Sequence, residues 1–187
     1  MQSATHEVTD EQILVLCHQP AQIEKGFRLL MVKYQEKLYW HVRRLVIEHE
    51  DANDVIQNVF VKAYRGIEGF KGKSKLYTWL YRIATNEAIT FLNRKKRRRT
   101  SSIDEEEHDL ANRLKADDYF DGNEAQIKLQ QALTTLPDKQ KIVFNMRYFE
   151  EMSYKEMSAV LETSVGALKA SYHHAVKKIE RHLLEER

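Results

Sequence analysis

The sequence predicts an all-α fold made of two small helical domains joined by an acidic linker. Apolar residues recur at steps of three and four along most of the chain, the spacing that places them on one face of a helix. The 187 residues include only six glycines and two prolines, too few for the frequent turns of an all-β sandwich or barrel. The periodicity lapses over residues 100–124, and this separates a domain at residues 1–99 from one at residues 125–187.

Three amphipathic helices are expected in the first domain. An apolar stripe over residues 27–45 predicts the first, and Asp51, a residue type that caps helix N-termini, is expected to open the second. Three glycines then place a loop between Arg65 and Ser74. Ser74 is expected to cap the third helix, whose apolar stripe continues to Phe91.

The second domain is expected to end in a helix-turn-helix. Periodicity returns over residues 125–136, and Pro137 ends that helix and can begin the next. Ser153 and Glu156 have the spacing of a capping box, which opens a short helix. A turn at residues 162–164 leads into the last helix, and the glutamate that opens this turn is strained if the turn requires a positive φ.

The charge is distributed unevenly, although the net charge is only +2. Residues 71–99 carry ten basic side chains and one acidic one, whereas residues 100–124 carry nine acidic and two basic ones. Aromatic residues are interleaved with the basic ones, a mixture that suits single-stranded nucleic acid because cations follow the phosphates and rings stack on bases. The alternative is that the rings belong to the core and the basic run is a solvated helix end.

The last helix has a surface suited to duplex DNA. Small residues near its N-terminus would allow close approach to base edges, and lysine and histidine follow one and two turns later. The same pattern also fits a plain α-helical hairpin with no DNA-binding role.

Enzymatic and metal-binding functions have little support, and neither a cofactor nor a metal is expected. His49, Glu50, Asp51 and Asp54 could hold a divalent cation, but acids at a helix N-terminus also interact favourably with the helix dipole. No phosphate-binding loop is present, and the single cysteine, Cys17, excludes an internal disulfide. The absence of a membrane span or a secretory signal favours a cytoplasmic protein.

Two parts of the sequence resemble conserved regions of bacterial RNA polymerase sigma factors. The first part resembles regions 2.2 to 2.4 and reads DANDVIQNVFVKAY, followed by FKGKSKLYTWLYRIATNEAI. The second resembles region 4.2 and reads YKEMSAVLETSVGALKASYHHAVKKI. Their order and spacing are similar to those of the extracytoplasmic-function (ECF) class of the sigma-70 family, which keeps only regions 2 and 4. The resemblance covers roughly residues 22–99 and 125–184.

The resemblance implies a non-catalytic factor that binds core RNA polymerase, directs it to promoters and assists promoter opening. It implies docking on the β′ clamp helices of the polymerase and contact with its β subunit. It also implies recognition of the −10 element as a non-template single strand and of the −35 element as duplex. An anti-sigma protein is a further implied partner. The linker would run toward the active-site channel. The alternative is a stand-alone helix-turn-helix regulator that binds duplex DNA without polymerase.

The resemblance also implies three sets of residues. The polymerase-binding set is Asp51, Asp54, Gln57, Asn58, Phe60 and Lys62. The −10 set is Phe70, Lys71, Ser74, Tyr77, Trp79, Arg82, Asn86 and Arg94. The −35 set is Ser164, Gly166, Lys169, Ala170, His173 and Lys177. Thr90, Glu162 and Ser171 depart from the common pattern of the family, and they bear on the promoter sequence preferred rather than on the general function.

Overall fold

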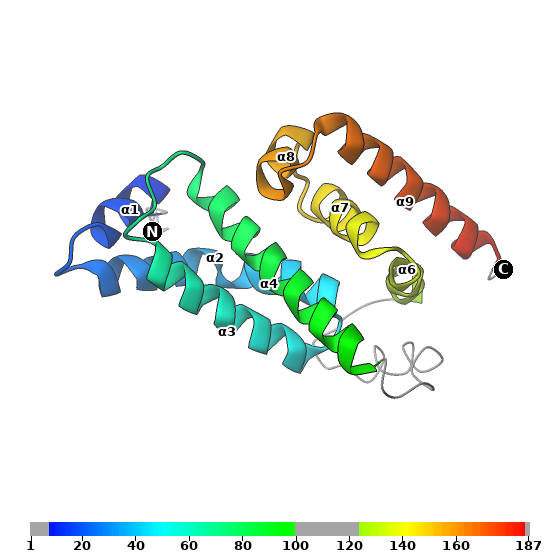
Figure 1. Ribbon diagram of the computed structural model, residues 1–187, viewed down its shortest axis with the longest axis horizontal. Coiled ribbons are helices and arrows are strands. Elements are labelled where there is room, and N and C mark those ends of the chain that lie inside the picture. The colour runs from blue at the N-terminus through cyan, green and yellow to red at the C-terminus, as the bar shows by residue number, and fades with distance from the viewer. Residues whose placement is uncertain (1–7, 100–123, 186–187) are drawn as a thin grey trace, which may run out of the picture.

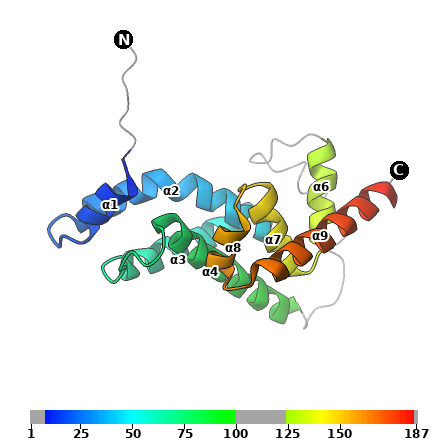
Figure 2. The ribbon, with the colours of Figure 1, turned by 90° about the horizontal axis from the view of Figure 1, so that it is seen from above.

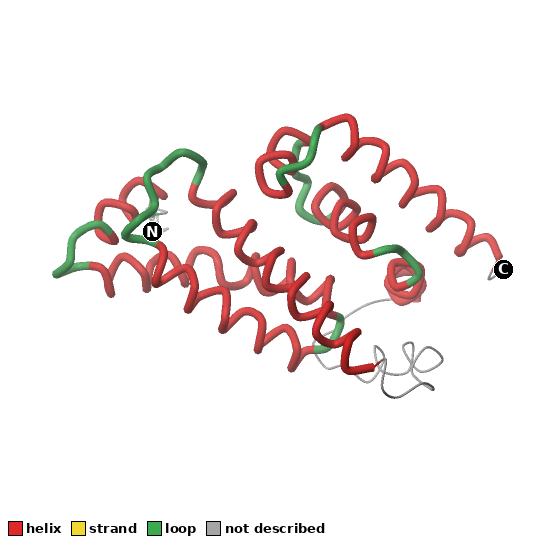
Figure 3. Tube along the Cα trace, in the orientation of Figure 1, coloured by secondary structure: helices red, strands yellow, loops and turns green. Residues whose placement is uncertain are grey.

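The structure is a computed structural model that describes residues 8–99 and 124–185. These residues form eight helices and no strand, which confirms the all-α class (Figures 1 and 3). The helices are α1 (Asp10–Cys17), α2 (Ile23–Val46), α3 (His49–Gly66), α4 (Leu76–Arg99), α6 (Glu124–Thr134), α7 (Asp138–Tyr148), α8 (Tyr154–Leu161) and α9 (Val165–Glu185). Most of the expected linker, residues 100–123, lies outside the described part, and Glu124 already belongs to α6.

Helix α1 was not among the predicted elements. A capping box opens it, because the Thr9 hydroxyl accepts the Gln12 N–H while the Gln12 side chain accepts the Thr9 N–H. Ile13 and Cys17 are buried where α1 packs on α2. The Tyr34 hydroxyl donates to an Asp10 carboxylate oxygen at 2.8 Å, which fixes the start of α1 against α2. The sequence signal was present in the Thr-x-x-Gln spacing.

Helices α2, α3 and α4 pack side by side as a three-helix unit (Figures 1 and 2). Each turns its apolar stripe inward, as the sequence predicts, because a stripe at this spacing can leave water only by facing another helix. The two alanines of α4 let its backbone approach the other helices closely. The central core residues are Leu30, Leu38, Val42, Val55, Val59, Leu80, Ala84 and Ala88, each at most 2% exposed.

Two of the predicted helix caps are wrong. Helix α3 begins two residues before Asp51, whose carboxylate instead accepts a hydrogen bond from Lys95 Nζ of α4 at 2.7 Å. Helix α4 begins at Leu76, so Lys75 occupies the position predicted for Ser74. The side chain of Asp51, predicted to cap α3, instead forms an ion pair with α4.

The helix-turn-helix is present in the second domain. The Ser153 hydroxyl accepts the Glu156 N–H at 3.3 Å and the Glu156 carboxylate accepts the Ser153 N–H at 2.9 Å, which confirms the capping box. Met157 and Leu168 are buried between α8 and α9. Glu162 has φ 52° and ψ 36°, so the turn does require a left-handed residue there.

The two domains pack against each other through α4 and α8 and through α2 and α7 (Figure 2). Leu45 and Tyr81 of the first domain share one hydrophobic cluster with Met146, Met152 and Val160 of the second. A separate cluster holds α6, α7 and α9 together. The sequence predicts two domains joined by a linker. In the structure, buried residues of both domains belong to one hydrophobic cluster.

His41 links α2 to α4 inside the first domain. Its Nε2 lies 2.9 Å from Thr85 Oγ1, and because that hydroxyl donates to the Tyr81 carbonyl at 2.7 Å, the ring nitrogen is the donor. The side chain is fully buried, and burial, with a contribution from the nearby Arg44 charge, lowers the pKa of His41 to about 3. His41 is therefore neutral in the folded protein at physiological pH.

His41 should make the protein sensitive to acid. An unfolded histidine binds a proton below its ordinary pKa of 6.5, whereas the folded one stays neutral down to about pH 3. Stability is therefore fully present above pH 6.5 and falls as the pH drops, by about 1.4 kcal/mol per pH unit at most. Chemical denaturation of wild type and His41→Gln at several pH values should show a shallower acid slope for the variant. Parallel slopes would exclude this role, whatever the variant's absolute stability.

Gly26 should be irreplaceable where α1 meets α2. A Cβ at this position would lie 2.7 Å from the Cys17 backbone nitrogen and 2.8 Å from Leu16 Cβ, so α1 would have to move. We expect Gly26→Ala to lower the unfolding free energy by about 1–3 kcal/mol, as overpacking does. Gly166→Ala is the matched control, because nothing lies within 4 Å of its Cβ position, and removing a helical glycine should stabilise by about 0.5–1 kcal/mol. Thermal unfolding measures both, and equal effects would contradict the close contact.

Candidate functional site

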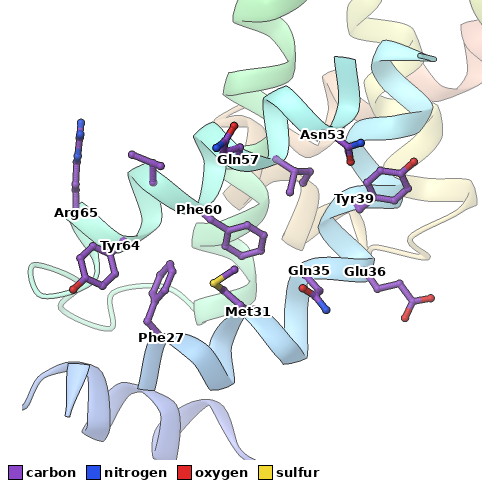
Figure 4. Close-up of a pocket in the computed structure, with 12 residues that line it drawn as sticks. Phe27, Met31, Gln35, Glu36, Tyr39, Asn53, Gln57, Phe60, Tyr64 and Arg65 are labelled. Carbon is purple, nitrogen blue, oxygen red and sulfur yellow. The ribbon is translucent and has the colours of Figure 1, made fainter. Parts of the chain in front are cut away.

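An apolar groove of about 970 Å³ runs between α2 and α3 (Figure 4). Phe27 and Phe60 meet edge to face at 6.3 Å between ring centroids, and Tyr64 meets Phe27 at 5.0 Å, so three rings from two helices build one wall. Val61 and Tyr64 are 43% and 41% exposed, unusually accessible for large apolar side chains. The groove is lined by Phe27, Met31, Gln35, Glu36, Tyr39, Asn53, Ile56, Gln57, Phe60, Val61, Tyr64 and Arg65.

The structure divides the predicted polymerase-binding set between two sides of α3. Gln57 and Phe60 line the groove. Asp51 and Lys62 face α4 instead, where Lys62 pairs with Glu87. The other two members, Asp54 and Asn58, are exposed on α3. The set is thus not one continuous face.

The groove contains residues that sequence reasoning missed. Phe27 and Met31 fall within the apolar stripe over residues 27–45 that predicts the first helix, and the sequence analysis assigns no binding role to them or to Tyr39. Ile56 of α3 also lines the groove. A signal was available, because Ile56, Phe60 and Tyr64 recur every four residues and so form a second apolar stripe on α3.

The −10 set lies in the loop before α4 and along α4. Lys71, Asn86 and Arg94 are exposed, and Ser74, Tyr77, Trp79 and Arg82 are partly buried. Phe70 is only 8% exposed, with its ring centroid 5.1 Å from that of Trp79. Phe70 is therefore a core residue that supports Trp79.

The position of Trp79 depends on a glycine. A Cβ at Gly66 would lie 3.1 Å from the Trp79 ring, so the indole rests directly on the end of α3. The loop then turns back at Gly72, whose φ of +67° favours glycine. Together these contacts leave Trp79 half-buried, with part of the ring accessible.

Several basic side chains of α4 already have acidic partners. Arg82 pairs with Glu162 at 2.9 Å and also donates to the Ala159 carbonyl. Lys96 pairs with Asp138 at 2.6 Å. Both acidic partners belong to the second domain.

All six residues of the −35 set are exposed on α9 and the turn before it. The Ser164 hydroxyl accepts the Ala167 N–H at 3.3 Å and so caps α9. Nothing lies within 4 Å of a Cβ built on Gly166, so the start of the helix is open to approach. Lys169 Nζ lies 5.8 Å from the centroid of the Tyr154 ring. This surface has the open N-terminal end and flanking cations of a duplex-reading helix.

The metal-binding alternative has no support in the described residues, which contain no group of three acidic, histidine or cysteine side chains able to hold an ion. His49 instead bonds the Tyr39 hydroxyl at 2.8 Å and the Asn53 amide at 2.9 Å. None of the helices in the described ranges has the length and apolarity that spanning a bilayer requires.

Comparison with known proteins identifies two matching family models and several similar proteins. The family models for sigma-70 region 2 and sigma-70 region 4 match residues 30–98 and 126–179. The chain resembles two sigma factors in structure. It matches the sigma factor RpoE bound to the anti-sigma factor NepR from Bartonella quintana with a TM-score of 0.68, 20% identity and coverage of 87% and 99% of the two chains. It matches CnrH bound to the cytosolic domain of CnrY with a TM-score of 0.70, 21% identity and coverage of 95% and 99%.

The curated relatives are similar over most of both sequences. The RNA polymerase sigma-H factor of Pseudomonas aeruginosa is 32% identical over 86% of this chain and 87% of its own length. The ECF RNA polymerase sigma-E factors of Haemophilus influenzae and Escherichia coli are each 33% identical over 84% of this chain, and over 87% and 86% of their own lengths. A stand-alone regulator would leave the region 2 match unexplained. The chain belongs to the sigma-70 family, as a non-enzymatic ECF-type RNA polymerase sigma factor that acts in transcription initiation.

Proposed function

We propose that this sigma factor binds its partners through three surfaces. The first domain, residues 1–99, binds core polymerase through the α2/α3 groove and the −10 element through α4 and the preceding loop. The second domain, residues 125–187, binds the −35 element as duplex through α9. The linker at residues 100–124 lies between them and runs toward the active-site channel of the polymerase. The observation that carries the proposal is that the three surfaces lie on different elements: the groove on α2 and α3, the −10 set on α4 and the loop before it, and the −35 set on α9 and the turn before it.

The groove suits an α-helical partner. It has an apolar floor with rings from two helices, and its rim carries polar groups such as Gln35, Gln57 and Arg65. An amphipathic helix can place its apolar stripe in such a groove and its polar side on such a rim. The β′ clamp helices of the polymerase are the partner that the family resemblance implies, with the exposed Asp54 and Asn58 beside the groove.

The −10 surface suits an unstacked DNA strand. Trp79 and Tyr77 offer partly accessible rings, and Lys71 and Arg94 offer cations for the phosphates. Asn86 is exposed on the same helix and can both donate to and accept from a base edge. Phe70 is buried and packs against Trp79, so we assign it a supporting role rather than direct contact with DNA.

We further propose an anti-sigma protein as a partner and the cytoplasm as the site of action. Both solved structures reported above are complexes of a sigma factor, one with the anti-sigma factor NepR and one with the cytosolic domain of CnrY. The same family resemblance also implies contact with the polymerase β subunit.

Polymerase binding tests the groove directly. Val61→Lys places a charge on the groove wall without disturbing the buried side of α3, and it should abolish co-elution with core RNA polymerase during gel filtration. Val15→Lys is the matched control, because Val15 is also an exposed valine, 57% accessible, but lies on α1. Co-elution retained by Val61→Lys would move the docking surface elsewhere, and the α4-facing side of α3 could then be tested through Lys62.

Promoter opening tests Asn86. The side chain is exposed, so Asn86→Ala should fold normally and still bind core enzyme. Loss of a net hydrogen bond to a base would weaken open-complex formation about 3- to 10-fold, since such a bond contributes about 0.5–1.5 kcal/mol. The measurement is permanganate reactivity of promoters that wild-type holoenzyme selects from a randomised duplex library. Normal opening by the variant would remove Asn86 from the −10 surface.

A further inference from the structure

We propose that Tyr39 is a hydrogen-bond-donor subsite at one end of the α2/α3 groove, and that His49 and Asn53 set the direction in which it donates. The inference rests on the proposed function of the groove and deepens it by naming a residue that discriminates between partner helices. Tyr39 contacts the partner, whereas His49 and Asn53 are positioning residues because they act through the Tyr39 hydroxyl. The partner helix is expected to present a hydrogen-bond acceptor at this point.

The two ends of the groove differ in polarity. Phe27 and Tyr64 lie at one end, where their ring centroids are 5.0 Å apart, and Tyr39 and Asn53 lie at the other (Figure 4). Tyr39 belongs to α2 and Asn53 to α3, so each wall contributes a polar group there. Apolar contacts have no direction, so discrimination between helices of similar shape depends on the polar end.

One imidazole joins the two walls at the polar end. His49, the first residue of α3, bonds the Tyr39 hydroxyl through Nδ1 at 2.8 Å and the Asn53 side-chain nitrogen through Nε2 at 2.9 Å. The His49 and Tyr39 rings also meet edge to face, with centroids 5.9 Å apart. The Trp40 ring meets the Tyr39 ring at 5.3 Å in the same manner. These contacts fix the position of the Tyr39 hydroxyl on the groove wall.

A strained corner brings His49 over α2. Only Ile47 and Glu48 separate α2 from α3, and the Glu48 N–H donates to the Val46 carbonyl at 3.0 Å, which closes a three-residue turn. Ile47 has φ 74° and ψ −48° in this turn, a conformation that is rare and strained for a β-branched residue. Strain of this kind persists only where the surroundings fix it, and it clusters at functional sites. The corner therefore places His49 against Tyr39 at a cost to the fold.

The hydrogen bonds determine the direction of the Tyr39 hydroxyl. An amide nitrogen can only donate, so His49 Nε2 accepts from Asn53 and carries no proton. A neutral imidazole holds its one proton on the other nitrogen, so His49 Nδ1 donates to the Tyr39 oxygen. The Tyr39 O–H is then left to donate to another group. Because Tyr39 is partly buried in the groove wall, a docked helix is positioned to accept that hydrogen bond.

The acceptor on the partner should be uncharged. Glu36 lies one helical turn before Tyr39 on α2 and also lines the groove, so it would repel a carboxylate placed beside Tyr39. A glutamine, asparagine or serine oxygen meets both conditions, because it accepts a hydrogen bond without adding negative charge. A helix without an acceptor at this point would leave the covered hydroxyl unpaired and would bind less tightly.

The direction of the hydroxyl is tested on free full-length protein. Long-range ¹H–¹⁵N NMR of protein with ¹⁵N-labelled histidine, in mildly alkaline buffer, should show the His49 proton on Nδ1 and none on Nε2. The His49 signals are assigned by their loss in His49→Asn. A proton on Nε2 would overturn the proposal, because the Tyr39 hydroxyl would then donate to His49 and not to a partner.

Binding is measured by titrating fluorescently labelled full-length protein with core RNA polymerase. Tyr39→Phe keeps the ring and removes the hydroxyl, and it should weaken binding about 3- to 10-fold, as expected for the loss of one hydrogen bond. Tyr148→Phe is the matched control, because it removes the hydroxyl of a 54% exposed tyrosine on α7 that does not line the groove. Its affinity should equal that of wild type.

The role of His49 is tested by rescue. His49→Leu removes both hydrogen bonds and should weaken binding as Tyr39→Phe does, and the double variant should bind no more weakly than either single variant. His49→Asn also removes the ring, but its amide nitrogen can donate from the position of Nδ1, so it should restore most of the affinity. Tyr39→Phe remains decisive if His49→Leu does not fold.

Three binding results would overturn the Tyr39 subsite. They are equal affinities for Tyr39→Phe and Tyr148→Phe, folded His49→Asn that binds as weakly as His49→Leu, and additive losses in the double variant. Val61→Lys is measured in parallel. Wild-type affinity in Val61→Lys would overturn the proposed function of the groove and the subsite with it, whereas lost affinity in Val61→Lys together with any of the three results would overturn the subsite alone.

Discussion

The packing of α4 between its neighbours is the constraint on which the other features of the structure depend. One side of the helix must bury Leu80, Ala84 and Ala88 against α2 and α3, and this fixes its rotation. Once that rotation is set, Arg82 must point toward the second domain and Lys95 toward α3. The His41–Thr85 hydrogen bond fixes the helix along its axis as well. The core of the first domain therefore determines which α4 side chains face α3 and which face the second domain.

The polar contacts around α4 follow from its charge. A helix with a basic C-terminal run cannot bury those cations without partners, because isolated charges are costly outside water. The fold supplies carboxylates from three directions, with Asp51 from α3, Asp138 from α7 and Glu162 from the turn after α8. Exposed pairs of this kind contribute little stability individually, about 0–1 kcal/mol each. These ion pairs specify how α4 is oriented relative to its neighbours, but they add little to the stability of the fold.

The sequence alone was sufficient for the fold class, the helix-turn-helix and most helix positions. These predictions rest on local patterns such as the Ser153–Glu156 capping box and the spacing of apolar residues. Each pattern is formed by residues close together in the sequence, so no knowledge of the tertiary structure is needed to detect it. The caps at Asp51 and Ser74 failed because a tertiary ion pair and a one-residue shift of the helix start decided them. The burial of Phe70 could not be predicted from the sequence, because it depends on how the helices cross. The second apolar stripe on α3, which includes Phe60, indicated an additional apolar face but not the groove that α2 completes. The contact of Arg44 with Glu150 lies 106 residues apart in sequence, and no periodicity reports it.

The placement of the surfaces gives a physical reason for polymerase and DNA to bind cooperatively. The groove lies between α2 and α3, whereas the proposed −10 surface lies on α4, which also packs against α8 of the second domain. If α4 binds a DNA strand as proposed, a partner that favours separation of the two domains would raise the affinity of α4 for that strand, and the strand would favour that partner by the same factor. The predicted −35 set is exposed while the two domains are packed together, so this coupling would act on the proposed −10 surface alone.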